Sequence, residues 1–113
     1  MDMSEEKKVV LCCANFYERK YYLNPAFEKL PQGIKEELKI MCVLFTEDVG
    51  GILALEYKAD GTLCFRVESE RMDILYDEIG SELKIRQLQQ EKRQLLEELE
   101  LFYKVFFLKQ KIE

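Results

Sequence analysis

The segment Ile52–Glu68 reads ILALEYKADGTLCFRVE, in which two alternating apolar runs flank an Asp-Gly pair. A two-residue turn at that pair would place Leu63 opposite Lys58 and mix apolar with polar side chains on each face. A three-residue loop instead pairs Tyr57 with Leu63 and gathers the large apolar side chains on one face: Leu53, Leu55, Tyr57, Leu63, Phe65 and Val67. Because a slip of one residue would turn every side chain to the wrong face, the pattern predicts a hairpin in this register, with Gly61 as the left-handed residue of its turn.

A helix is predicted immediately before this hairpin. Pro31 suits the first position of a helix, and Gly50-Gly51 is suited to end one. Between them, apolar residues recur at the spacings of one helix face: Ile34, Leu38, Met41, Phe45 and Val49. Every residue from Ile40 to Phe45 is apolar, so we expect this part of the helix to be covered on several sides.

The N-terminal part of the chain predicts another hairpin. Lys8–Ala14 is rich in residues that favour strands, and Lys20–Asn24 forms a second strand that Pro25 stops. The residues between these strands, Asn15–Arg19, would make the turn. We expect residues 1–7 to be flexible, as chain ends commonly are.

The last third of the chain, residues 72–110, reads as one long amphipathic helix. Within it, residues at alternating spacings of three and four form a heptad row: Ile85, Leu88, Lys92, Leu95, Leu99, Phe102 and Phe106. All but Lys92 are apolar, which is the pattern by which one helix buries itself against another in a coiled coil. Gly80 is where we expect a kink or a break in this helix, and Asp73 is the expected N-cap.

The length of this helix limits how it can pack. About 38 helical residues would extend roughly 57 Å, whereas a compact chain of this size has a radius of gyration of roughly 13 Å. The helix must therefore break, fold back over the sheet or cross to a second chain. Lys92, the polar member of the heptad row, either fixes the register of a parallel dimer or marks where the helix leaves its own domain.

Together these elements predict an α+β fold with the order ββαββα, in a single domain that spans residues 1–113. Short connections make the sheet antiparallel. The helices, including the long C-terminal one, are expected on the sheet face that carries the large apolar side chains of residues 52–68.

The composition argues against several classes of function. With 17 basic and 22 acidic side chains, the chain has a formal charge of −5, so we expect no nucleic-acid partner. The N-terminus is acidic, unlike a secretory signal. The longest apolar run, Val9–Ala14, is far shorter than the roughly 20 residues that span a bilayer. We therefore expect a cytoplasmic protein without a membrane partner.

The sequence contains no histidine, which removes Ser–His–Asp and Cys–His nucleophile pairs and nearly all catalytic zinc sites. None of the four cysteines shows Cys-x-x-Cys spacing, and no glycine-rich loop is suited to hold a phosphate. We accordingly predict no catalytic residue, no metal ligand and no cofactor.

Four residues are candidates for a ligand site. Glu47 and Asp48 lie at the end of the predicted helix, where acids meet the negative end of the helix dipole. Such a placement fits a site for a metal or a partner's cation, and it equally fits acids that solvate the end of an apolar helix. Tyr21 and Tyr22 would either stack on an aromatic ligand or divide between the core and its rim.

Three stretches carry a resemblance to a known family: Lys20-Tyr21-Tyr22-Leu23-Asn24-Pro25, Leu30-Pro31 and Glu47-Asp48-Val49-Gly50-Gly51-Ile52. They resemble a family of small bacterial proteins with no assigned function. The resemblance implies a bacterial cytosolic protein and nothing about activity.

Two hypotheses for function follow from the residues. The first is a non-enzymatic protein-interaction module that forms a homodimer through the heptad row of its C-terminal helix, or docks on a different protein through its aromatic C-terminus. The second is a small-molecule or metal-binding protein, conceivably a carboxylate-based enzyme, that uses Glu47, Asp48, Tyr21 and Tyr22.

Overall fold

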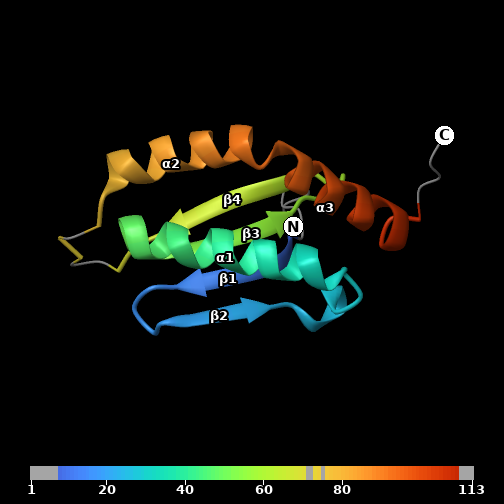
Figure 1. Ribbon diagram of the computed structural model, residues 1–113, viewed down its shortest axis with the longest axis horizontal. Coiled ribbons are helices and arrows are strands. Elements are labelled where there is room, and N and C mark those ends of the chain that lie inside the picture. The colour runs from blue at the N-terminus through green and yellow to red at the C-terminus, as the bar shows by residue number, and fades with distance from the viewer. Residues whose placement is uncertain (1–7, 71–72, 75, 110–113) are drawn as a thin grey trace, which may run out of the picture.

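The computed structural model describes residues 8–70, 73–74 and 76–109. The expected flexibility of residues 1–7 and the expected start of the last helix at residue 72 lie outside these ranges. The elements, in chain order, are β1 (Val9–Asn15), β2 (Lys20–Leu23), the 3₁₀ turn η1 (Pro25–Phe27), α1 (Gln32–Val49), β3 (Ile52–Tyr57), β4 (Leu63–Glu68), α2 (Glu78–Glu91) and α3 (Arg93–Phe106). The fold is α+β, with one layer of helices over one sheet (Figure 1).

The four strands form an antiparallel sheet in the order β2-β1-β3-β4. The register predicted for the second hairpin is confirmed, since Tyr57 pairs with Leu63 and Leu53 with Val67. The backbone N–H of Lys58 donates to the carbonyl of Thr62 at 2.8 Å, which closes the three-residue loop. Gly61 has a φ of 92°, the left-handed conformation that this bulged turn requires.

The first hairpin places its residues on two different faces of the sheet. Cys12 pairs with Leu55 and therefore lies on the helix-covered face, where its Sγ is 3.7 Å from that of Cys42 in α1. A register shift between Val10 and Cys12 marks a bulge in β1. Because side chains alternate along a strand, Tyr21 lies on the helix-covered face and Tyr22 on the opposite face.

Helix α1 lies across the sheet and begins one residue later than expected, with Pro31 at the N-cap position. Its predicted apolar face is confirmed in the core, where Leu38, Phe45 and Val49 are buried. The expectation that the apolar stretch is covered on several sides is wrong. Ile40 is 58 % exposed and Leu44 is 57 % exposed. The sheet covers one side of α1 and α2 flanks another, so the outward side of this stretch is left open to solvent.

The C-terminal segment is not one long helix, and the observed order is ββ-ηα-ββ-αα rather than ββαββα. The break is at Lys92, which ends α2 and precedes α3 with a φ of −107° and a ψ of 24°. Gly80, where the break was expected, instead lies in the first turn of α2. Its N–H donates to Asp77 Oδ1 at 2.8 Å, so Asp77 rather than Asp73 is the N-cap. A Cβ at Gly80 would lie 2.2 Å from the Asp77 carboxylate, which explains a glycine at this position.

The heptad row faces the chain's own sheet. Leu88, Leu95 and Leu99 are buried in the core, and Ile85 and Phe102 pack against it. Only Phe106, at the end of the row, is mostly exposed. Of the three outcomes left open by the sequence, the structure shows a break, at Lys92, and both resulting helices pack against the chain's own core.

An aromatic cluster fixes α3 to the sheet and to η1. The ring of Tyr103 stacks on Tyr57 with centroids 4.1 Å apart, and Phe107 stacks on Phe27 at 4.8 Å. The hydroxyl of Tyr57 donates to the backbone carbonyl of Leu99 at 2.8 Å. Of the C-terminal aromatic residues that suggested an association surface, Tyr103 is buried and Phe102 packs against the core. Phe106 is 58 % exposed and Phe107 is 36 % exposed.

Candidate functional sites on two sides of helix α1

The first candidate site is a groove between α1 and α2. Asp48, near the end of α1, pairs with Lys84 of α2 at 3.3 Å, and Glu37, near its start, pairs with Lys92 at 3.4 Å. The two helices therefore run antiparallel, with an ion pair at each end of the groove. Its volume is about 520 Å³. Its apolar lining comes from both helices and consists of Ile40, Met41, Leu44 and Leu88.

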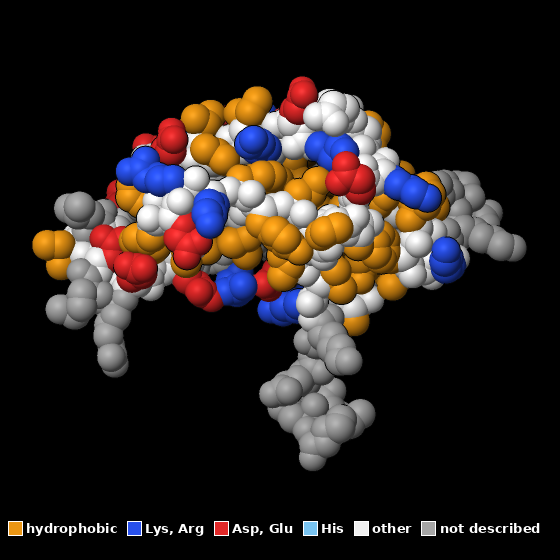
Figure 2. Space-filling view, turned by 90° about the horizontal axis from the view of Figure 1, so that it is seen from below, with side chains coloured by type: hydrophobic (Ala, Val, Ile, Leu, Met, Phe, Trp, Pro, Cys, Tyr) orange, Lys and Arg blue, Asp and Glu red, His pale blue; other side chains and the backbone are white. Residues whose placement is uncertain are grey.

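Charge is divided between the two rims of this groove. The α1 rim contributes Glu36 and Glu37, and the α2 rim contributes Lys84 and Lys92 together with one acid, Glu91. Further out on α2, Leu83 and Ile79 are also mostly exposed. The groove thus combines an apolar floor with one acidic rim and one mainly basic rim. Charged side chains of both signs also flank a band of apolar ones when the molecule is seen from the β2 edge (Figure 2).

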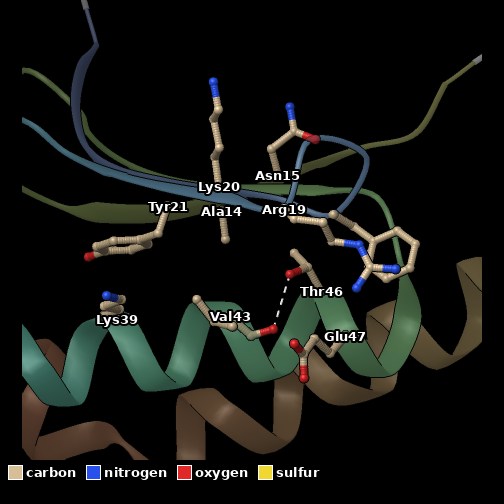
Figure 3. A pocket seen from close by; sticks show the side chains of 10 residues that line it. Ala14, Asn15, Arg19, Lys20, Tyr21, Lys39, Val43, Thr46 and Glu47 are labelled. Atoms are coloured by element: carbon tan, nitrogen blue, oxygen red, sulfur yellow. Dashed lines mark hydrogen bonds between the residues drawn. The ribbon is translucent and has the colours of Figure 1, made fainter.

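The second candidate site is a cleft of about 380 Å³ on the other side of α1, between that helix and the β1–β2 hairpin (Figure 3). Lys39, Val43 and Glu47 line it from α1, because residues four apart lie on one side of a helix. The hairpin contributes Ala14, Phe16, Arg19 and Tyr21, while the Lys20 side chain points away from α1. Thr46 of α1 also lines the cleft, but its hydroxyl already donates a hydrogen bond to the backbone carbonyl of Val43 at 3.1 Å.

The charged groups of the cleft have no ion-pair partner among the described residues. Arg19 places its guanidinium 4.3 Å from the centre of the Phe16 ring, and neither it nor Lys39 or Glu47 forms a salt bridge there. The buried hydroxyl of Tyr21 likewise has no nitrogen or oxygen partner and lies beside the Cys12 thiol. Burial, followed by the nearby Cys12 and Cys42, raises the pKa of Tyr21, so its hydroxyl stays protonated and can donate.

The four predicted ligand residues are divided among three places. Glu47 and Tyr21 line the same cleft. Asp48 turns toward Lys84 at one end of the groove. Tyr22 lies on the opposite face of the sheet, where it is 51 % exposed. The structure therefore brings together half of the predicted set.

Sequence reasoning missed the two cationic residues of the cleft, Arg19 and Lys39. The signal for Lys39 was its spacing from Glu47, which places both on one side of α1. No comparable signal marks Arg19, because it lies in the hairpin turn, with a φ of 55°, where no helix or strand spacing indicates the direction of a side chain.

Two structural features are absent from the described part of the chain. No group of three or more Cys, Asp or Glu side chains there is arranged to hold a metal ion. None of its helices combines the length with the apolar composition needed to cross a bilayer.

Comparison with curated proteins finds no match, and comparison with solved structures finds none either. One family model does match, over residues 8–111, which is nearly the whole chain of 113 residues. It describes a family of unknown function, in agreement with the resemblance seen in the sequence. The chain therefore belongs to DUF6145, a family of unknown function.

Proposed function

We propose that this chain is a non-enzymatic protein-interaction module whose partner is a second copy of itself, and that the α1–α2 groove is the interface. The observation that supports this most directly is the exposure of Ile40 and Leu44. They lie in a stretch of α1 where every residue is apolar, and a helix that is apolar all round is normally buried all round. A second copy supplies the missing cover.

The heptad row is a weaker candidate for this interface than the α1–α2 groove. Leu88, Leu95 and Leu99 are at most 7 % exposed within a single chain. A dimer through these side chains would have to pull α2 and α3 off the sheet and expose Tyr57 and its neighbours. The groove needs no such rearrangement.

The charges of the groove favour a second copy over an unrelated partner. A two-fold axis in the plane of the interface and parallel to the helices lays α1 of each copy over α2 of the other. The acidic rim then faces the partner's lysine-bearing rim in both halves of the interface. Glu37 and Asp48 pair with Lys92 and Lys84 of their own chain, and the same lysines of the partner lie across from them in the dimer. A surface with one acidic and one basic rim is complementary to itself in this arrangement.

The expected dimer is a weak one. Full burial of a Leu or Ile side chain contributes about 1.5–3 kcal/mol. A side chain that is about half-exposed in the monomer therefore contributes roughly 1 kcal/mol more when the dimer buries the rest of it. Ile40, Leu44 and Leu83 from both copies together give on the order of 6 kcal/mol, against an association cost of about 4–15 kcal/mol. We therefore expect a dimer that dissociates on dilution.

The test is the molar mass in solution, by size exclusion with light scattering over a hundredfold dilution. The wild-type chain is expected to shift from dimer to monomer, and the double variant Ile40→Glu/Leu44→Glu to remain a monomer with an unchanged circular dichroism spectrum. Leu101→Glu is the matched control, because Leu101 is 49 % exposed on α3, away from the groove, and this variant should dimerise like wild type. A wild-type monomer at the highest concentration, or a double variant that still dimerises, would overturn the proposal.

A further inference from the structure

We propose that the cleft between α1 and the β1–β2 hairpin binds a small acidic α-amino acid, with its zwitterionic head at Arg19 and Glu47 and its second carboxylate at Lys39 and Tyr21. This site is distinct from the dimer interface, because Lys39, Val43 and Glu47 line the cleft and none of them lines the groove.

The head-group end of the cleft holds one cation and one anion. Figure 3 shows the Arg19 side chain descending from the hairpin turn on the same side of the cleft as Glu47. Stacking on Phe16 holds the guanidinium in position. An α-carboxylate fits the forked donors of Arg19, and an α-ammonium fits the carboxylate of Glu47. A molecule that carries both groups on one carbon satisfies both side chains at once.

The other end of the cleft offers two hydrogen-bond donors, the Tyr21 hydroxyl and the Lys39 ammonium, and no negatively charged side chain. Tyr21 and Lys39 lie together at this end in Figure 3. The Tyr21 hydroxyl is buried beside the thiols of Cys12 and Cys42, and no nitrogen or oxygen of the described residues accepts its proton. A carboxylate would accept from this hydroxyl and pair with the ammonium of Lys39. Because a thiol is a weak hydrogen-bond acceptor, the Tyr21 hydroxyl calls for a stronger acceptor on the ligand rather than an apolar tail.

The distance between the two ends fits a short apolar spacer. Lys39 and Glu47 are just over two helical turns apart, roughly 12 Å along the helix axis, and both side chains can reach inward. Ala14 and Val43 line the middle of the cleft with apolar surface. The cleft volume of about 380 Å³ is near the lower end for ligand pockets, which suits a molecule of amino-acid size.

Isothermal titration calorimetry with L-glutamate tests this proposal, with glutarate and L-glutamine as comparison ligands. Glutarate lacks the ammonium group and L-glutamine lacks the second carboxylate. We expect L-glutamate to bind and each comparison ligand to bind about tenfold more weakly or worse, as the loss of one charged contact predicts. Equal binding of glutarate and L-glutamate would overturn the assignment of the head group, and no heat with any of the three would overturn the site.

Matched variants locate the binding within the molecule. Glu47→Gln and Lys39→Gln should each weaken L-glutamate binding about tenfold or more, and Tyr21→Phe should weaken it by a smaller factor. Asp48→Asn and Lys20→Gln are their controls, because Asp48 pairs with Lys84 outside the cleft and Lys20 points away from α1. Unchanged binding in Glu47→Gln would contradict the proposal.

The titration is also made on the double variant Ile40→Ser/Leu44→Ser, which removes the apolar groove side chains without placing a charge beside Lys39 or Glu47. Binding should be the same as in the wild-type chain, so the result does not depend on dimer formation. Loss of binding in this variant, with its fold intact, would place the ligand at the interface between copies and would contradict the cleft assignment.

Discussion

Two rows of apolar side chains lie on the helices of this molecule, and the chain covers only one of them. The heptad row of α2 and α3 is covered by the sheet and by the aromatic cluster, and Leu99 in that row has no exposed surface. The outward row of α1, with Ile40 and Leu44, is covered by nothing in the described part of the chain. Regular apolar spacing therefore indicates that one face of a helix can be buried. Whether the same chain or another molecule covers that face depends on which elements lie next to it.

The difference arises from where each helix sits over the sheet. The break at Lys92 turns α3 so that Leu95 and Leu99 stay on the sheet and Tyr103 reaches Tyr57. Helix α1 is held by the sheet on one side and by α2 on another, and its outward side has no third layer above it (Figure 1). The two rows should consequently respond to mutation in opposite ways.

The largest expected effect is that of Leu99→Glu in the covered row. A carboxylate at this fully buried position would have no charged partner, and the penalty is comparable with the roughly 5–15 kcal/mol of stability of a whole domain. We expect the variant to lose its folded circular dichroism signal, while Leu101→Glu on the same helix stays folded. A Leu99→Glu chain that is folded and monomeric would instead assign the heptad row to a contact between chains.

The next effect in size is that of Phe27→Ala, which removes the centre of the aromatic cluster. Phe27 has no exposed surface, and its ring lies close to those of Tyr57, Phe102, Tyr103 and Phe107. Replacement of a buried Phe by Ala typically lowers the free energy of unfolding by about 3–5 kcal/mol. Urea denaturation measures this loss. A loss below about 1 kcal/mol would mean that α3 is not held to the sheet through η1.

The sequence predicts the fold best where a one-residue shift in strand pairing would move many apolar side chains from the core to the solvent. The β3–β4 register was predictable because a slip would expose Leu53, Leu55 and Phe65 together. The helix break was not predictable, because Lys92 carries no special backbone preference while Gly80 does. The Gly80 N–H instead donates to the Asp77 side chain that caps α2, and a Cβ at residue 80 would collide with that carboxylate. Only the structure reveals this contact between residues three apart.

The candidate ligand site was predictable only in part, for a similar reason. Tyr21 and Tyr22 are neighbours in sequence, but a strand directs neighbouring side chains to opposite faces. Glu47 and Asp48 are about 100° apart around α1, which separates the cleft from the groove. Each pair of neighbouring residues, two tyrosines or two acids, therefore looked like part of one ligand site in the sequence. In the structure, the two members of each pair lie on different surfaces.

A smaller effect is expected for Tyr57→Phe, which tests how α3 is joined to the sheet. The variant loses the hydrogen bond to the Leu99 carbonyl and about 1 kcal/mol of stability at pH 7. Burial is the main cause that raises the pKa of Tyr57 above its ordinary value of 10.0. Above about pH 10 the unfolded chain therefore binds fewer protons than the folded one, and the free energy of unfolding falls as the pH rises.

The same variant should make this alkaline loss shallower, by at most about 1.4 kcal/mol per pH unit for one group. Urea denaturation at pH 8 and pH 11 measures the difference between wild type and variant. An identical alkaline loss in both would show that Tyr57 titrates alike in the folded and unfolded chains. Tyr21→Phe is the useful comparison, because burial also raises the pKa of that hydroxyl on the cleft side.

The smallest expected effect on folding is that of Ile40→Ala in the open row. Because this side chain is 58 % exposed, its truncation should change the free energy of unfolding of the monomer by about 0.5 kcal/mol or less. The same change should still weaken the dimer measurably, since the truncated methyl groups would be buried only between copies. Urea denaturation at a concentration where the chain is monomeric gives the first value, and light scattering gives the second. A loss of 2 kcal/mol or more in the monomer, the range of a buried Ile, would mean that the open row is covered within the chain after all.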